Sequence, residues 1–99
     1  MEINNFLART FGLDGKVAVV IGGGGYLCSK MAEGLARAGA KIVILDLRPA
    51  NAESKTKEIE KITSENYLSY GIDVCDKKSI EETYKKIVDS YNTVDILIN

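Results

Sequence analysis

Four consecutive glycines, Gly22 to Gly25, stand between an apolar run and a segment with helical periodicity, and this placement could bind phosphate. Glycines lack a Cβ atom, so the chain can turn tightly and bring its peptide N–H groups close to an anion. A helix that begins directly after such a loop adds unpaired N–H groups and the positive end of its dipole. The sequence therefore predicts an anion-binding loop, and the less favoured alternative is a flexible surface turn.

Asp46 is the second residue with a defined chemical use, because it ends the next apolar run. It follows the glycines at about the 20-residue distance at which an acid binds the ribose of a dinucleotide. A carboxylate there accepts hydrogen bonds from both ribose hydroxyls and repels a 2′-phosphate. Leu47 is apolar and the loop holds no Lys or Arg, although Arg48 lies two places beyond the acid. Loop and acid together favour NAD over NADP as the cofactor.

The elements that would position these residues alternate along the chain. Apolar runs rich in β-branched residues predict strands at 17–21, 41–46, 67–72 and 94–99. Helical periodicity predicts helices between them, over about 27–38, 49–63 and 77–91, the last capped by Asp76 and the first closed by Gly39. The order β-α-β-α-β-α-β predicts an α/β fold, a doubly wound parallel sheet with right-handed crossovers and strand order 3-2-1-4. Residues 1 to about 14 are expected to form an entry segment, and the rest of the chain one unit.

Each predicted helix has a stripe of apolar residues that we expect to face the sheet. In the three helices the stripes consist of Leu27, Met31, Leu35 and Ala38; of Ile59 and Ile62; and of Ile80, Thr83, Tyr84, Ile87, Val88 and Tyr91.

Composition limits the class of protein. The 99 residues allow one small domain, and a net charge of −1 gives no electrostatic reason to expect nucleic acid or an anionic membrane as a partner. Two cysteines and no histidine leave almost nothing for a transition-metal site. A structural disulfide is the less favoured alternative, and buried free thiols are expected. No stretch has the apolar length of a signal peptide or a membrane span. We expect a cytoplasmic protein.

With these residues in place, the sequence resembles the short-chain dehydrogenases/reductases, from LDGKVAVVIGGGG through AEGLARAGAKIVILDLR and GIDVCD to VDILIN. Gly22 matches the first glycine of the family's Thr-Gly-x-x-x-Gly-x-Gly loop. The resemblance implies cofactor contacts of three further kinds: with the pyrophosphate from Gly24, Gly25 and Leu27; with the ribose from Asp46 and Leu47; and with the adenine from Asp73 and Val74. Asn99 matches the first residue of the Asn-Asn-Ala-Gly segment after the fourth strand. The fold implied is Rossmann-type.

Three positions depart from the family pattern. Ile21 stands where the family has Thr, and Tyr26 and Cys28 replace the second and third loop glycines. Tyr26 replaces the glycine that permits close approach to the pyrophosphate, and Cys28 is small enough for tight packing of helix on strand. The loop and the AKIVILDLR segment are most similar to the fructuronate reductase (D-mannonate oxidoreductase) branch.

The resemblance implies an NAD-dependent oxidoreductase that transfers hydride between nicotinamide and a hydroxyl or carbonyl carbon, with a sugar acid as the substrate class. It implies a homo-oligomer, a dimer or tetramer, and a catalytic Ser, Tyr and Lys. Tyr26 and Lys30 have the spacing of that Tyr-Lys pair, but they lie on the first helix instead of the one after the fifth strand, so we expect no catalytic role for them. No other Tyr-x-x-x-Lys occurs. Residues 1–99 are therefore expected to be the N-terminal NAD-binding portion of a single domain without catalytic residues, marginally stable and prone to associate through its last strand.

Two other functions remain open. A nucleotide-binding module without catalysis would need the same loop and acid. A methyltransferase dependent on S-adenosylmethionine also uses both, but usually has an acid at the end of its first strand, where this chain has Val20 and Ile21.

Overall fold

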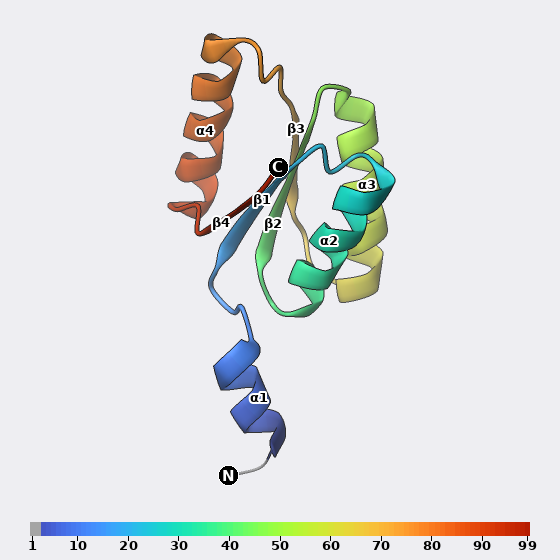
Figure 1. Ribbon diagram of the computed structural model, residues 1–99, viewed down its shortest axis with the longest axis vertical. Coiled ribbons are helices and arrows are strands. Elements are labelled where there is room, and N and C mark those ends of the chain that lie inside the picture. Colours follow the sequence, from blue (N-terminus) through green and yellow to red (C-terminus); the bar gives the residue numbers. More distant parts are fainter. Residues whose placement is uncertain (1–2) are drawn as a thin grey trace.

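The computed structural model describes residues 3–99 as a four-stranded sheet between helices (Figure 1). The elements, in chain order, are α1 (Ile3–Phe11), β1 (Val17–Ile21), α2 (Tyr26–Arg37), β2 (Lys41–Asp46), α3 (Pro49–Thr63), β3 (Leu68–Gly71), α4 (Lys77–Tyr91) and β4 (Ile96–Ile98).

All four strands are parallel and their order is β3-β2-β1-β4, which confirms the predicted topology. Val17 of β1 pairs with Lys41 of β2, and Ala18 pairs with Ile96 of β4. The carboxyl ends of the strands therefore meet at one edge of the sheet, at the top of Figure 1, where the loops into α2 and α4 also lie.

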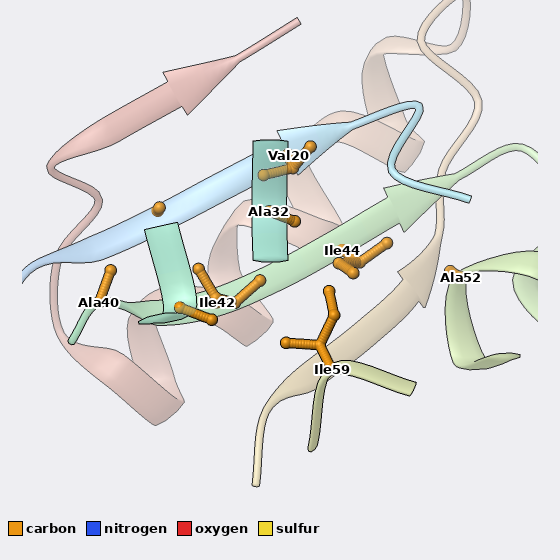
Figure 2. Packing of buried hydrophobic residues seen from close by; sticks show 9 residues of the cluster. Val20, Ala32, Ala40, Ile42, Ile44, Ala52 and Ile59 are labelled. Atoms are coloured by element: carbon orange, nitrogen blue, oxygen red, sulfur yellow. The ribbon is translucent and has the colours of Figure 1, made fainter. Parts of the chain in front are cut away.

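Both faces of the sheet are covered, which explains why the strands are apolar at successive positions. Alternate residues of β1 and β2 point to α2 and α3 on one face, where the core is built around Val20, Ile42 and Ile44 (Figure 2). The intervening residues, such as Val19 and Val43, point to α4 on the other face. Figure 1 shows α4 on the opposite side of the sheet from α2 and α3.

The predicted inward face of α2 is confirmed only in part, because Leu35 packs against the core. Leu27 and Met31 are exposed, at 66% and 43%, whereas Ser29, Ala32 and Ala36 are buried. Small side chains face the sheet because β1 and β2 already fill the space with branched residues, so α2 packs closely only through a smooth surface. Ser29 is accommodated there because its hydroxyl donates to the Tyr26 carbonyl at 2.8 Å.

The stripes on α3 and α4 are only partly buried. Ile59 is buried but Ile62 is 43% exposed, and α3 instead buries Ala52 and Thr56. On α4, Thr83 and Ile87 are buried, whereas Ile80 and Tyr84 are exposed. Ile80 and Tyr84 line an apolar groove of about 290 Å³ between α4 and the sheet.

Helix α1 was not predicted. It lies below the sheet in Figure 1 and buries none of its residues. Its apolar residues Ile3, Phe6, Leu7 and Phe11 follow helical spacing. The tether to the domain is Leu13, whose N–H donates to the Ala38 carbonyl at 2.8 Å.

The predicted helix ends are close to the observed ones. The Asp76 carboxylate caps α4 by accepting from the Lys78 N–H at 3.0 Å. Gly39 follows the last residue of α2 by two places with φ of +104°, a left-handed conformation that favours glycine.

Candidate functional site

The structure brings the ends of the strands that carry the predicted site residues to one edge of the sheet. Gly22 directly follows β1, and Asp46 ends β2 and pairs with Gly71 of β3. Asp73 lies two residues beyond β3, and Asn99 directly follows β4. Strands β2 and β3 lie on one side of β1 and β4 lies on the other, so the strand order reverses at β1, where the glycine loop starts. In open parallel sheets ligands bind at such a switch point, outside the carboxyl ends of the strands.

The glycine loop is held mainly by its own peptide groups. The N–H groups of Gly22 and Gly23 both donate to the Leu45 carbonyl, at 2.7 and 3.1 Å, and the Gly25 N–H donates to the Gly22 carbonyl at 3.1 Å. Gly22 has φ of +78°, so a side chain there would be strained. These three amides are thus engaged within the protein and serve to shape the loop.

Gly24 connects the loop to the acid. Its N–H donates to Asp46 Oδ2 at 3.1 Å, and the other oxygen, Oδ1, accepts from the Arg48 N–H at 3.0 Å. Asp46 is half-buried at the end of β2. The loop and the carboxylate therefore form one hydrogen-bonded unit.

The open hydrogen-bond donors lie just after the glycines, in the first turn of α2. Ser29 is the first residue of the helix whose N–H reaches a backbone acceptor, the Gly25 carbonyl. The amides of residues 26–28 have no acceptor within the part of the chain that the structure describes. They stand at the positive end of the helix dipole, where an anion is stabilised. This end of α2 and the glycines before it fit the pyrophosphate of a dinucleotide.

Tyr26 does not fill this position with its ring. Its side chain is 76% exposed and lines a small cavity between α2 and α3 together with Lys55 and Ile59. The Lys30 ammonium lies 5.7 Å from the centre of the Tyr26 ring. Both side chains lie on the flank of α2 toward α3, so the Tyr-Lys spacing corresponds to a cation–π contact at the surface in this structure.

The remaining predicted residues are exposed around the same edge. Leu27 and Leu47 are 66% and 71% exposed, and Val74 is 55% exposed. Asp73 is fixed in the turn after β3, where Oδ1 accepts from the Cys75 N–H at 3.0 Å and its own N–H donates to Ser79 Oγ at 3.1 Å. Exposed apolar and polar groups around the loop leave room for a ligand to lie across the edge.

Sequence reasoning missed three contributors. Gly23 is buried, and a Cβ there would lie 2.6 Å from Ile44 Cγ2, so the loop can pack against the core only with glycine at this position. In a run of four glycines nothing marks which one packs against the core. The Arg48 N–H, which donates to Asp46 Oδ1, and Asn51, whose Cβ lies beside Gly24, were also missed. The only sign of their place in the sequence is that α3 starts just after Asp46.

Other groups lie away from this edge. Burial raises the pKa of Tyr91, and the phenols of Tyr67 and Tyr70 and the carboxylate of Glu60 raise it further. Tyr91 lines a cavity of about 610 Å³ at the amino-terminal edge of the strands, beside Arg37 and Lys41, far along the strands from the glycine loop.

The described residues contain neither a group of three potential metal ligands nor a helix long and apolar enough to cross a membrane. Cys28 and Cys75 are free thiols. Cys28 is half-buried and packs against the core, but Cys75 is exposed, so the expected burial is wrong for Cys75.

Sheet order, glycine loop and strand-end acid define a Rossmann-type dinucleotide-binding fold. Residues 16–99 match the short chain dehydrogenase family, and the chain belongs to that family. It is 39% identical over 87 residues to the uncharacterized oxidoreductase UxuB of Bacillus subtilis (strain 168), a match that covers 88% of this chain and 31% of the relative.

Two solved structures show the same fold. An NAD-bound protein from Haemophilus influenza, assigned as a D-mannonate oxidoreductase, superposes with a TM-score of 0.82 at 33% identity, over 92% of this chain and 32% of that one. The 2-keto-3-deoxy-D-gluconate dehydrogenase of Streptococcus agalactiae superposes with a TM-score of 0.86 at 32% identity, over 97% and 36%. The chain thus spans about a third of the length of these relatives, and the predicted likeness to the mannonate oxidoreductase branch is confirmed.

Proposed function

We propose that residues 1–99 are the N-terminal, cofactor-binding portion of an NAD-dependent short-chain oxidoreductase. The observation that carries this proposal is the hydrogen bond from the Gly24 N–H to Asp46, beside the open first turn of α2. It links the glycine loop to the strand-end acid, which supports an anion site and a ribose acceptor next to each other. The pyrophosphate would lie against Gly24, Gly25 and Leu27, within reach of the open amides of residues 26–28, and the adenosine ribose against Asp46 and the neighbouring Leu47.

The outer residues extend this assignment. Asp73 and Val74 follow β3 on the side of Asp46 and would lie along the adenine. Asn99 follows β4 on the other side of β1 and would lie toward the nicotinamide half of the cofactor. Bound NAD would supply hydride transfer to or from a carbon that bears a hydroxyl or carbonyl group. The part of the chain described here would bind and orient the cofactor, and a Ser and a Tyr-x-x-x-Lys beyond residue 99 would act on the substrate.

We propose NAD over NADP as the cofactor, and a sugar acid of the fructuronate or mannonate type as the substrate. The Asp46 carboxylate is half-buried and held by two amides, so a 2′-phosphate would meet a fixed negative charge. The sugar-acid substrate is supported by the names of two similar structures, a D-mannonate oxidoreductase and a 2-keto-3-deoxy-D-gluconate dehydrogenase. A homo-oligomeric parent and a cytoplasmic location belong to the same proposal, and the two free thiols fit a reducing compartment.

Calorimetric titration of the 99-residue chain with NAD, NADP and S-adenosylmethionine tests the nucleotide assignment. We expect measurable binding of NAD, at least tenfold weaker binding of NADP, and none of S-adenosylmethionine. A preference for S-adenosylmethionine would make the chain part of a methyltransferase, and failure to bind any of the three would remove the nucleotide-binding proposal.

The alternative of a nucleotide-binding module without catalysis is separated by the coding sequence after Asn99. A downstream Ser and Tyr-x-x-x-Lys, followed by NAD-dependent turnover of fructuronate or mannonate in the expressed protein, would support the oxidoreductase. A stop codon directly after Asn99 would leave a nucleotide binder.

A further inference from the structure

Both oxygens of the Asp46 carboxylate are engaged before any ligand binds. Oδ2 accepts from the Gly24 N–H and Oδ1 from the Arg48 N–H, at 3.1 and 3.0 Å. One donor belongs to the glycine loop and the other to the residue that precedes α3. A carboxylate has about four lone-pair positions, so each oxygen keeps capacity for one more donor. The two amides thus fix the direction in which those remaining positions point.

The absent side chain of Gly24 makes this arrangement possible. A Cβ atom there would lie 2.7 Å from Asp46 Oδ2 and 2.8 Å from the Asn51 Cβ. The Asn51 Cβ is part of the first turn of α3, and Asp46 is short and attached to a core strand, so neither gives way easily. Of the four loop glycines, Gly24 is the one whose missing side chain faces the acid: Gly22 has open space, Gly23 faces Ile44, and Gly25 faces the Gly22 carbonyl.

We propose that Gly24 is a positioning residue for cofactor selection, which holds the Asp46 carboxylate in the orientation that accepts the two ribose hydroxyls. This inference rests on the proposed function, because it concerns the same dinucleotide site. Selection of NAD over NADP then depends on the glycine loop as well as on the Asp46 carboxylate. Asp46 alone, without the Gly24 N–H and the space beside it, would turn away from the ribose.

The physical reason is preorganisation. An unrestrained aspartate must lose side-chain freedom when it binds a diol, and it can swing aside from a phosphate. A carboxylate held by two amides does neither, so it binds the ribose hydroxyls without reordering and keeps its charge at the place where a 2′-phosphate would come. Displacement of the carboxylate should therefore weaken NAD binding and relieve the repulsion of NADP together.

The test compares dissociation constants for NAD and NADP in three single variants of the 99-residue chain. In Gly24→Ala we expect NAD affinity to fall roughly tenfold or more, as for loss of hydrogen bonds to a charged group, with a smaller change for NADP. The ratio of the NADP dissociation constant to the NAD dissociation constant should therefore fall. Gly25→Ala, whose Cβ would meet only the Gly22 carbonyl at 3.5 Å, should change both constants in proportion. Gly34→Ala, with open space on the outer side of α2, should change neither.

A double-mutant cycle with Asp46→Ala then isolates the link. If Gly24 acts through the acid, Gly24→Ala should lower NAD affinity far less in the Asp46→Ala background than in the wild type. An equal loss in both backgrounds, or an unchanged ratio of NAD to NADP in Gly24→Ala, would overturn the inference while the wild type still bound NAD. A wild type that bound no NAD would instead overturn the proposed function.

Amide hydrogen exchange provides a measurement that does not require the Gly24→Ala protein to fold. Asp46→Ala removes the acceptor of the Gly24 N–H, whereas the amides of Gly22, Gly23 and Gly25 keep their carbonyl acceptors. We expect exchange to accelerate at least tenfold at Gly24 and to change little at the other three. Uniform acceleration across the loop would show that Asp46 merely supports the fold, and unchanged exchange at Gly24 would show that the hydrogen bond does not form.

Discussion

Gly23→Ala should destabilise the chain through a contact that the structure defines closely. The added Cβ would lie 2.6 Å from Ile44 Cγ2 and 3.1 Å from the Val20 carbonyl oxygen. Ile44 is fully buried among core residues of β1, α2 and α3, and the carbonyl belongs to the central strand, so neither atom can retreat cheaply. Overpacking of this kind costs about 1–3 kcal/mol.

Urea unfolding at low protein concentration measures this effect, with Gly34→Ala as the matched control. Both variants add one methyl group to a glycine, but Gly34 lies within α2 and faces open space. Alanine there should raise the free energy of unfolding by about 0.5–1 kcal/mol through helix propensity. Gly23→Ala should lower the melting temperature by about 4–8 °C for each kcal/mol lost. Equal stability of Gly23→Ala and the wild type would refute the packing argument.

Three further predictions concern other parts of the molecule. Asp95→Ala should lower the free energy of unfolding in urea by about 1–3 kcal/mol, because Asp95 Oδ2 accepts from the Val17 N–H at 2.9 Å; exposed Asp89→Ala should be neutral. The free energy of unfolding should fall as pH rises above about 10, because folding raises the pKa of Tyr91 and the unfolded chain therefore loses the Tyr91 proton first. If the urea midpoint of a Tyr91→Phe variant fell between pH 9 and 11 as much as that of the wild type, this explanation would be contradicted. Leu97→Lys should reduce self-association measured by sedimentation, since Leu97 is 60% exposed on the edge strand β4. A wild type that stayed monomeric at high concentration would show that β4 does not promote association.

The sequence predicted the strands and their order because the information is local and repeated. Continuous apolar runs such as Val17–Ile21 require cover on both faces, and the alternation with helices leaves few topologies. The faces of the helices were harder. Leu27 and Met31 have the periodicity of a core stripe, yet α2 packs through Ala32 and Ala36, because the distance between helix and sheet is a property of the assembled layers.

Helix α1 escaped prediction for a related reason. Its residues have helical spacing, but a short segment that buries nothing in the domain leaves no contact pattern with other elements from which to infer it. Nine residues are also marginal for a helix that lacks tertiary support.

For the candidate site, the proximity of Asp46 to the glycine loop could be predicted from the sequence, but the hydrogen bonds that join them could not. The order of glycine loop, helix and acid follows from chain positions, and the acid does lie beside the loop. Which glycine donates to Asp46 could not be inferred, because four identical residues in a row carry no distinguishing pattern. The roles of the other predicted site residues in cofactor binding stay predictions.

The internal bonding of the glycine loop bears on how a ligand would be received. Since Gly22, Gly23 and Gly25 have acceptors within the protein, the loop already has its shape, and binding would immobilise few additional bonds. We expect the thermodynamics of rigid docking: a small, area-proportional change in heat capacity and no coupled folding. Ligand-induced changes in NMR chemical shift should then be concentrated at the amides of residues 26–28. Runs of glycine are usually flexible, but hydrogen bonds within the protein stiffen this one.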